Sequence, residues 1–107
     1  MAQLKSSASS EGGRLRRLAM NTATELMFTQ NSGYQAEQIG LTRPDCLRVI
    51  ASGRVIKSER SDPDWRRWVQ GQDLDGNTIT LVVTVVQMDE QRKRIVILNC
   101  EKEEVVS

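Results

Sequence analysis

The sequence predicts an α+β fold, in which two or three N-terminal helices pack on one face of a small antiparallel sheet of about four strands. Two observations lead to this prediction. Apolar residues recur at intervals of three and four in the first half of the chain, which is typical of amphipathic helices. After Gly53 the period changes to two, which is typical of strands joined by hairpins. The 107 residues suffice for one modest core, so we expect a single domain.

Both ends of the chain are expected to lie outside this domain. Residues 1–13, MAQLKSSASSEGG, are rich in Ser, Gly and Ala and have almost nothing to bury, so they predict a disordered tail. The single α+β domain is expected over residues 14–101. Residues 102–107, KEEVVS, are interpreted as a charged tail.

The first helix is expected in RLRRLAMNTATELMF. Residues at spacings of three and four give it an amphipathic pattern: Leu15, Leu18, Thr22, and Leu26 or Met27. Its polar face carries three arginines: Arg14, Arg16 and Arg17.

Two further helical segments follow. NSGYQAEQIG predicts a short or irregular segment, because Gly33 weakens a helix and Gly40 suits a C-terminal cap. The clearest helix is expected over residues 43–52, since Thr42 can cap it and Pro44 falls in its first turn.

The second half of the chain predicts a meander of strands. RVIKSER forms the first, and SDPD makes a turn at Pro63. In WRRWVQGQD, alternating residues share a face: Trp65, Arg67 and Val69 on one side, and Arg66, Trp68 and Gln70 on the other. Asp75-Gly76, followed by Asn77, indicates a hairpin, because these residues tolerate positive φ. TITLVVTVVQM is the expected central strand, and RIVILNC the last.

Composition excludes several classes of site. Fifteen basic and 14 acidic residues give a net charge of +1, so any basic site must be local. The chain has no histidine, and Cys46 and Cys100 are too few and too distant for a disulfide framework, so we expect two buried thiols and neither metal nor cofactor. No apolar run is long enough to span a membrane and no signal peptide is evident, so no membrane contact and a cytoplasmic location are expected.

The frame GLTRPDCLRVIASGRVI, then a polar strand, QGQDLDGNTITLVVTVV and RIVILNC, resembles the DUF4258 family. These are small bacterial and phage domains similar to the RelE-type toxin superfamily. The resemblance covers about residues 28–100. It includes a Gly-x-Asp-x-Asp-Gly hairpin: Gly71, Asp73, Asp75 and Gly76.

The family typically carries a His-x-x-x-Arg-x-x-x-Arg-Gly-Ile pattern before the second helix. Here Asn31 stands at the His, Gln35 at the first Arg and Ile39 at the second, before Gly40-Leu41. Asn and Gln are neutral and do not titrate. The resemblance therefore implies a degenerate form in which these positions carry no inherited catalysis.

Basic and aromatic residues on two neighbouring strands are candidates for binding nucleic acid or a partner: Arg54, Lys57, Arg60, Trp65, Arg66, Arg67 and Trp68. Guanidinium groups bind phosphate bidentately, and indole rings stack on bases. The alternative is that a tryptophan belongs to the core and the arginines form a solvated face paired with Glu59, Asp62 and Asp64. Glu59 as a general base and the Tyr34 hydroxyl are weak catalytic candidates.

Two functions remain open at this point. One is a non-catalytic or degenerate toxin-like binding module of the DUF4258 type, acting through a protein or through RNA or DNA, with a homodimer through a sheet edge also open. The other is a RelE-like ribonuclease toxin that uses an Arg/Trp sheet face. Loss of the family's charged residues favours a protein partner, whereas exposed tryptophans beside arginines favour nucleic acid.

Overall fold

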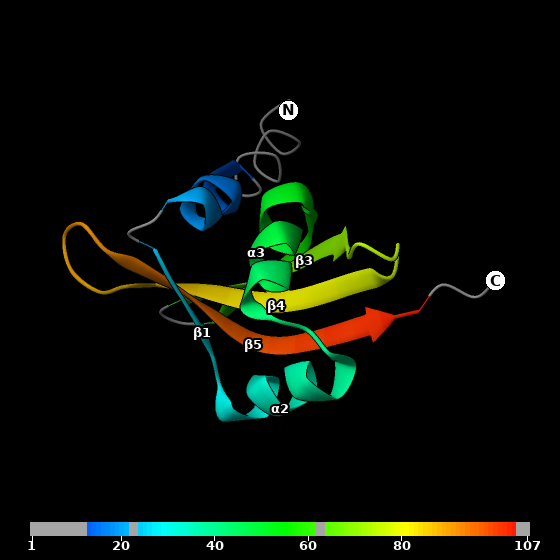
Figure 1. The fold of residues 1–107 in the computed structure, drawn as a ribbon. Helices are drawn as coiled ribbons and strands as arrows, with labels where there is room; N and C mark the ends of the chain where they lie inside the picture. The colour runs from blue at the N-terminus through cyan, green and yellow to red at the C-terminus, as the bar shows by residue number, and fades with distance from the viewer. Residues whose placement is uncertain (1–12, 22–23, 62–63, 105–107) are drawn as a thin grey trace.

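The structure, a computed structural model, describes residues 13–21, 24–61 and 64–104. It has the α+β class that the sequence predicts (Figure 1). A helix over residues 13–20, called here the N-terminal helix, comes first. The remaining elements are β1 (Glu25–Phe28), α2 (Gln30–Ile39), α3 (Arg43–Ser52), β2 (Arg54–Ser61), β3 (Asp64–Gln72), β4 (Thr78–Gln87) and β5 (Lys93–Glu103).

The sheet has five strands in the order β1-β5-β4-β3-β2 and is mixed, since β1 pairs with β5 in parallel and the other pairs are antiparallel. The expectation of about four antiparallel strands missed β1. The predicted first helix was too long, because the helix ends at Met20 and residues Glu25–Phe28 form strand β1. Leu26 faces the core from β1, whereas Met27 faces the other side of the sheet and is 37% exposed.

The second predicted helical segment is a regular ten-residue helix, α2, and not an irregular one. The Thr29 side chain caps its start by accepting a hydrogen bond from the backbone N–H of Ser32, and Gly40 ends it with a φ of 68°. Helix α3 occupies residues 43–52 as predicted. Thr42 and Asp45 form a reciprocal capping box at its start, with Pro44 in its first turn.

The core lies between the helices and one face of the sheet. Figure 1 shows the N-terminal helix and α3 in front of the sheet and α2 alongside β5. Buried side chains from all layers meet there: Leu15, Ala36, Leu41, Cys46, Val49, Ile50, Val69, Ile79, Leu81, Val83, Ile95, Ile97 and Cys100. Both cysteines are buried free thiols, as expected. Among the described residues, no helix is long and apolar enough to cross a membrane.

Helix α3 approaches β3 closely at Gly53. A Cβ atom there would lie 2.5 Å from the carbonyl oxygens of both Val49 and Gln70, so a side chain does not fit. The backbone N–H of Gly53 caps the helix by donating to the Val49 carbonyl at 2.7 Å. The glycine that ends α3 therefore also lets the helix rest directly on the sheet.

The hairpin between β3 and β4 forms where the sequence predicts it. A carboxylate oxygen of Asp73 accepts hydrogen bonds from the backbone N–H groups of Asp75 and Asn77, each at 2.9 Å. Gly76 has a φ of 84°, which glycine adopts readily. Strand β5 continues through Glu103 into the segment expected to be a charged tail. Four predicted features lie outside the described residues: Thr22, the turn at Pro63, Asp62, and residues 1–12 of the N-terminal tail.

Candidate functional site

The register of β3 divides the predicted Arg/Trp group between the two faces of the sheet. Arg67 pairs with Val83, whose side chain belongs to the core under the helices, so Arg67 points toward the helix side. Side chains alternate along a strand, so Trp65 also points to that side, while Arg66 and Trp68 point to the opposite side. The predicted alternation is confirmed. Neither tryptophan is part of the core cluster.

On the side away from the helices, the candidates form local pairs. The ammonium group of Lys57 lies 4.5 Å from the centroid of the Trp68 ring and 3.5 Å from a carboxylate oxygen of Glu59. Trp68 is half-buried, and Arg54 and Arg66 are exposed. On this side Lys57 is therefore engaged with both Trp68 and Glu59.

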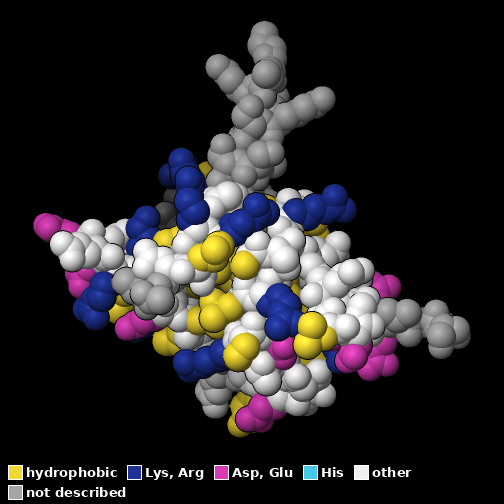
Figure 2. Space-filling view, turned by 45° about the horizontal axis from the view of Figure 1, so that its top comes forward, with side chains coloured by type: hydrophobic (Ala, Val, Ile, Leu, Met, Phe, Trp, Pro, Cys, Tyr) yellow, Lys and Arg dark blue, Asp and Glu magenta, His cyan; other side chains and the backbone are white. Residues whose placement is uncertain are grey.

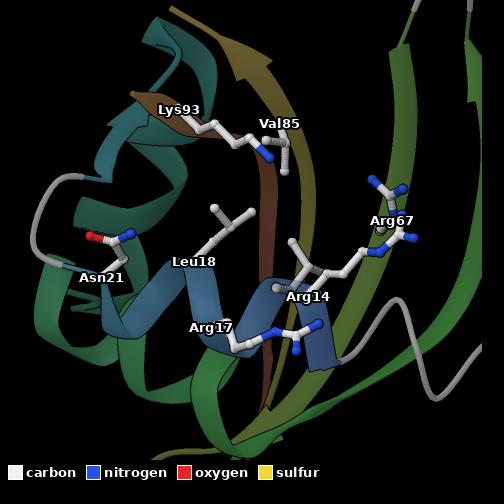
Figure 3. A pocket seen from close by; sticks show the side chains of 8 residues that line it. Arg14, Arg17, Leu18, Asn21, Arg67, Val85 and Lys93 are labelled. Atoms are coloured by element: carbon white, nitrogen blue, oxygen red, sulfur yellow. The ribbon is translucent and has the colours of Figure 1, made fainter. Parts of the chain in front are cut away.

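On the helix side, a cavity of about 450 Å³ lies between the N-terminal helix and strands β3 to β5. We call it the basic cavity. Eight residues line it: Arg14, Leu15, Arg17, Leu18, Asn21, Arg67, Val85 and Lys93. Figure 3 shows Lys93 and Val85 at one end, Arg14 and Arg17 at the other, and Leu18 between them.

The N-terminal helix supplies four of the eight described lining residues, because their spacing puts them on neighbouring turns of the helix. Leu15 is 2% exposed and anchors the helix in the core. Arg14, Arg17 and Leu18 stand at intervals of three and four, which puts them along one side of a helix. Burial of Leu15 thus fixes the helix with two guanidinium groups beside the cavity.

The strands supply the remaining charges. The pairing of β3 with β4 ends at Arg67 and Val83, which leaves room beyond that point between the two strands. Lys93 opens β5 two residues before Ile95, a fully buried core residue, so both side chains point to the helix side. Three segments far apart in the sequence thereby bring four cationic side chains to one cavity.

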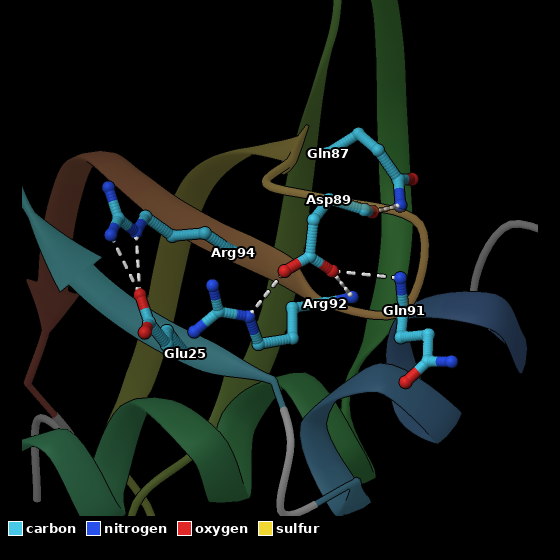
Figure 4. Close-up of polar contacts among 6 residues, drawn as sticks. All are labelled: Glu25, Gln87, Asp89, Gln91, Arg92 and Arg94. Carbon is cyan, nitrogen blue, oxygen red and sulfur yellow. Dashed lines mark hydrogen bonds and ion pairs between the residues drawn. The ribbon is translucent and has the colours of Figure 1, made fainter.

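Among the residues that the structure describes, no carboxylate lines the basic cavity. The two arginines that flank Lys93 are neutralised at the edge of the sheet (Figure 4). Arg92 contacts Asp89 at 2.7 Å and Arg94 contacts Glu25 at 2.7 Å. Hydrogen bonds from the backbone of Gln91 and the side chain of Arg92 lower the pKa of Asp89, which keeps that carboxylate ionised.

Three of the four cationic side chains of the cavity differ from Arg92 and Arg94 in having no ion pair with a described residue. Within the part of the chain that the structure describes, Arg14, Arg17 and Lys93 have no ion-pair partner, whereas Arg67 takes part in a further interaction within the chain. Figure 2 shows Lys and Arg side chains gathered around exposed hydrophobic side chains on this side of the molecule. The cavity therefore combines the positive charge of four cationic side chains with an apolar floor of Leu15, Leu18 and Val85.

The weak catalytic candidates do not line the cavity. Glu59 is on β2, in the ion pair with Lys57, and Tyr34 is on α2 with 61% of its surface exposed. The chain has no histidine, and no Asp, Glu, Cys or Tyr is among the described residues that line the basic cavity. Through its described residues, the site thus offers positive charge and hydrogen-bond donors, and neither of the two candidate catalytic side chains.

The three positions at which the chain departs from the DUF4258 pattern lie on α2 and have different environments. Gln35 fastens the helix to β5, because its carbonyl oxygen accepts from the backbone N–H of Cys100 at 2.9 Å and its amide donates to Asn99 at 2.7 Å. Ile39 packs against the core, and Asn31 is exposed. None of the three lines the basic cavity.

Among the described residues, no group of three or more His, Cys, Asp or Glu side chains is placed to hold a metal ion. Sequence reasoning assigned Arg14 and Arg17 to a polar helix face but did not join them to Arg67, and it did not single out Lys93. The sequence pattern that could have indicated this site is the three-residue spacing of Arg14 and Arg17 beside the apolar residue Leu15. Their meeting with β3 and β5 depends on tertiary packing.

Neither the models of known protein families nor the curated proteins include one that matches this chain. The resemblance to the DUF4258 family therefore stays a prediction.

Proposed function

We propose that this chain is a non-catalytic module that binds nucleic acid by holding backbone phosphates in the basic cavity. The observation that carries the proposal is the convergence of four cations from three elements on a cavity that, among the described residues, no carboxylate lines. The whole chain has a net charge of only +1, so this is a marked local concentration of positive charge. A degenerate binding module of the DUF4258 type is compatible with such a role.

The chemistry of the lining suits a nucleotide better than a small inorganic anion. Guanidinium groups bind phosphate oxygens in pairs, and a lysine adds a compact charge. The volume of about 450 Å³ exceeds the needs of a single phosphate and falls in the range of organic-ligand pockets. The apolar floor of Leu15, Leu18 and Val85 can contact a sugar or a base beside the phosphate.

Binding is favoured over the ribonuclease alternative because neither of the two candidate catalytic side chains is among the described residues that line the cavity. Cleavage of a phosphodiester by general acid and base catalysis needs at least one side chain that gains or loses a proton near the working pH. Neither Glu59 nor Tyr34 lines this cavity, so the cations there would hold a phosphate in place without activating a nucleophile.

The test is a titration of labelled RNA and DNA oligonucleotides at 50 and 200 mM salt, with a cleavage gel run on the same samples. Single strands lose affinity with a slope of about 0.7 per neutralised phosphate, so four contacts predict a loss of roughly fifty-fold between the two salts. Arg14→Ala/Arg17→Ala removes two contacts, which reduces that loss to roughly sevenfold and weakens binding at both salts.

The matched control is Arg54→Ala/Arg66→Ala, which removes the same charge from the opposite face of the sheet. We expect it to leave the salt dependence close to that of the wild type. Equal effects of the two double variants would show that binding reflects net charge alone, and absence of binding at both salts would overturn the proposal. Cleavage products from the wild type would replace it with the ribonuclease function.

A further inference from the structure

The β2–β3 hairpin carries an exposed tryptophan, Trp65, two residues from Arg67, which lines the basic cavity. Toward its N-terminal end, strand β3 is paired with β4 only as far as Arg67, but it remains paired with β2 as far as Asp64. The β2–β3 hairpin therefore continues beyond β4 as a two-stranded ribbon. Trp65 lies two residues beyond Arg67 on the same side of the ribbon, which separates their Cα atoms by about 7 Å. Arg67 lines the cavity, so Trp65 stands on the ribbon two residues from one of the lining residues.

The two tryptophans of the chain have different environments. Trp65 is 42% exposed and lies outside the core cluster, on the side of the cavity. Trp68 points to the opposite side and is half-buried, with the ammonium group of Lys57 4.5 Å from its ring. The indole of Trp65 therefore has a face to offer to a ligand, whereas that of Trp68 is already in contact with a cation.

From this arrangement we infer that the ligand is single-stranded nucleic acid, with a phosphate held in the basic cavity and an adjacent base stacked on Trp65. The inference rests on the proposed function. It adds that the nucleic acid is single-stranded and that Trp65 distinguishes a single strand from a duplex. Aromatic stacking platforms beside a positively charged groove are the usual means of binding single strands without sequence preference. In a duplex the bases are paired and stacked internally, so they cannot reach an indole on the protein surface.

Variants that each keep one of the two tryptophans allow the fluorescence of Trp65 and that of Trp68 to be measured separately. Trp68→Phe leaves Trp65 as the only indole, and Trp65→Phe leaves only Trp68. Titration of Trp68→Phe with a ten-nucleotide single strand, RNA and DNA in parallel, should quench the emission and reach saturation. The same titration of Trp65→Phe should leave the emission of Trp68 nearly unchanged.

Affinities from a labelled oligonucleotide complete the test. We expect Trp65→Ala to weaken single-strand binding by between about 5-fold and 150-fold, the range measured for one stacked base. The salt slope should stay that of the wild type, because no charge is removed. Trp68→Ala should change the affinity less than about twofold, and a duplex of the same sequence should bind at least about tenfold more weakly than the single strand.

Further variants separate stacking from folding. Trp65→Phe retains a ring and should keep most of the affinity, whereas Trp65→Leu retains apolar volume without a ring and should resemble Trp65→Ala. Equal binding of duplex and single strand, together with an unaltered affinity of Trp65→Ala, would overturn this inference. If binding still depended on salt in that case, the proposed function would remain supported. Failure of any oligonucleotide to bind would overturn both.

Discussion

The hydroxyl of Ser32 donates a 2.6 Å hydrogen bond to the backbone carbonyl of Ile97, joining α2 to β5 across 65 residues of sequence. The Ser32 side chain is fully buried, and its oxygen also accepts from the backbone N–H of Thr29 at 2.9 Å. One small side chain thus completes the cap of α2 and fixes that helix to the sheet.

Ser32→Ala should lower the free energy of unfolding by about 1–3 kcal/mol, because it removes the cap partner and leaves buried polar groups unpaired. Equilibrium urea unfolding measures the change. The control is Ser52→Ala, since the Ser52 hydroxyl bonds only to its own helix at an exposed position and its loss should cost less than about 0.5 kcal/mol. Equal costs for the two variants would contradict the structural role of Ser32.

Gln35 should not tolerate the arginine that the DUF4258 pattern has at this position. An arginine has no acceptor for the backbone N–H of Cys100 and cannot replace the carbonyl oxygen of Gln35. We expect Gln35→Arg and Gln35→Ala each to destabilise the fold by about 1–3 kcal/mol. Gln38→Ala, at an exposed position of the same helix, should be nearly neutral. A stable Gln35→Arg variant would show that the α2–β5 contact does not depend on this amide.

Burial raises the pKa of the Cys46 thiol from an ordinary value of 9.0 to about 12. Between these values the unfolded state has lost the proton and the folded state retains it, so stability falls as pH rises. The contribution is fully present below pH 9 and is lost through pH 12, at up to about 1.4 kcal/mol per pH unit. Urea unfolding of the wild type at pH 8 to 11 should therefore fall more steeply than that of Cys46→Ala. Parallel curves would contradict this prediction.

Lys93 and Arg92 are neighbours in the sequence but should differ in their effect on binding. Lys93 lines the basic cavity, whereas Arg92 is paired with Asp89 at 2.7 Å. Lys93→Ala should weaken nucleic-acid binding and reduce the salt slope by about one phosphate contact. Arg92→Ala removes the same charge one residue away and should change the slope much less. The reverse order would place the ligand at the β4–β5 turn instead of the cavity.

Local patterns were sufficient to predict the features of the fold that depend on nearby residues. Capping by Thr42, the position of Pro44 and the hairpin at Gly76 all act within a few residues, and each was found where the sequence placed it. The alternation of Arg67 and Trp68 along β3 is also local, because it follows from the pleat of the strand.

Features that depend on distant pairing were not predictable in the same way. Strand β1 has four residues and was interpreted as the end of a helix, because its apolar residues happen to match a helical spacing. Its strand conformation is stabilised by parallel pairing with β5, beginning at Glu25 and Arg94. The basic cavity also depends on distant pairing. The sequence shows that Lys93 and Arg14 are charged, but not that the two side chains line the same cavity.

The most direct test of the basic cavity is a map of backbone amide chemical shifts during titration of the ¹⁵N-labelled protein with a short single strand. We expect the shifts to concentrate at the N-terminal helix, Trp65, Arg67, Val85 and Lys93. Amides of Lys57 and of β5 beyond Cys100 should shift little. A concentration of shifts at α2, at the β3–β4 turn or at no defined surface would contradict the claim that this cavity holds the nucleic acid.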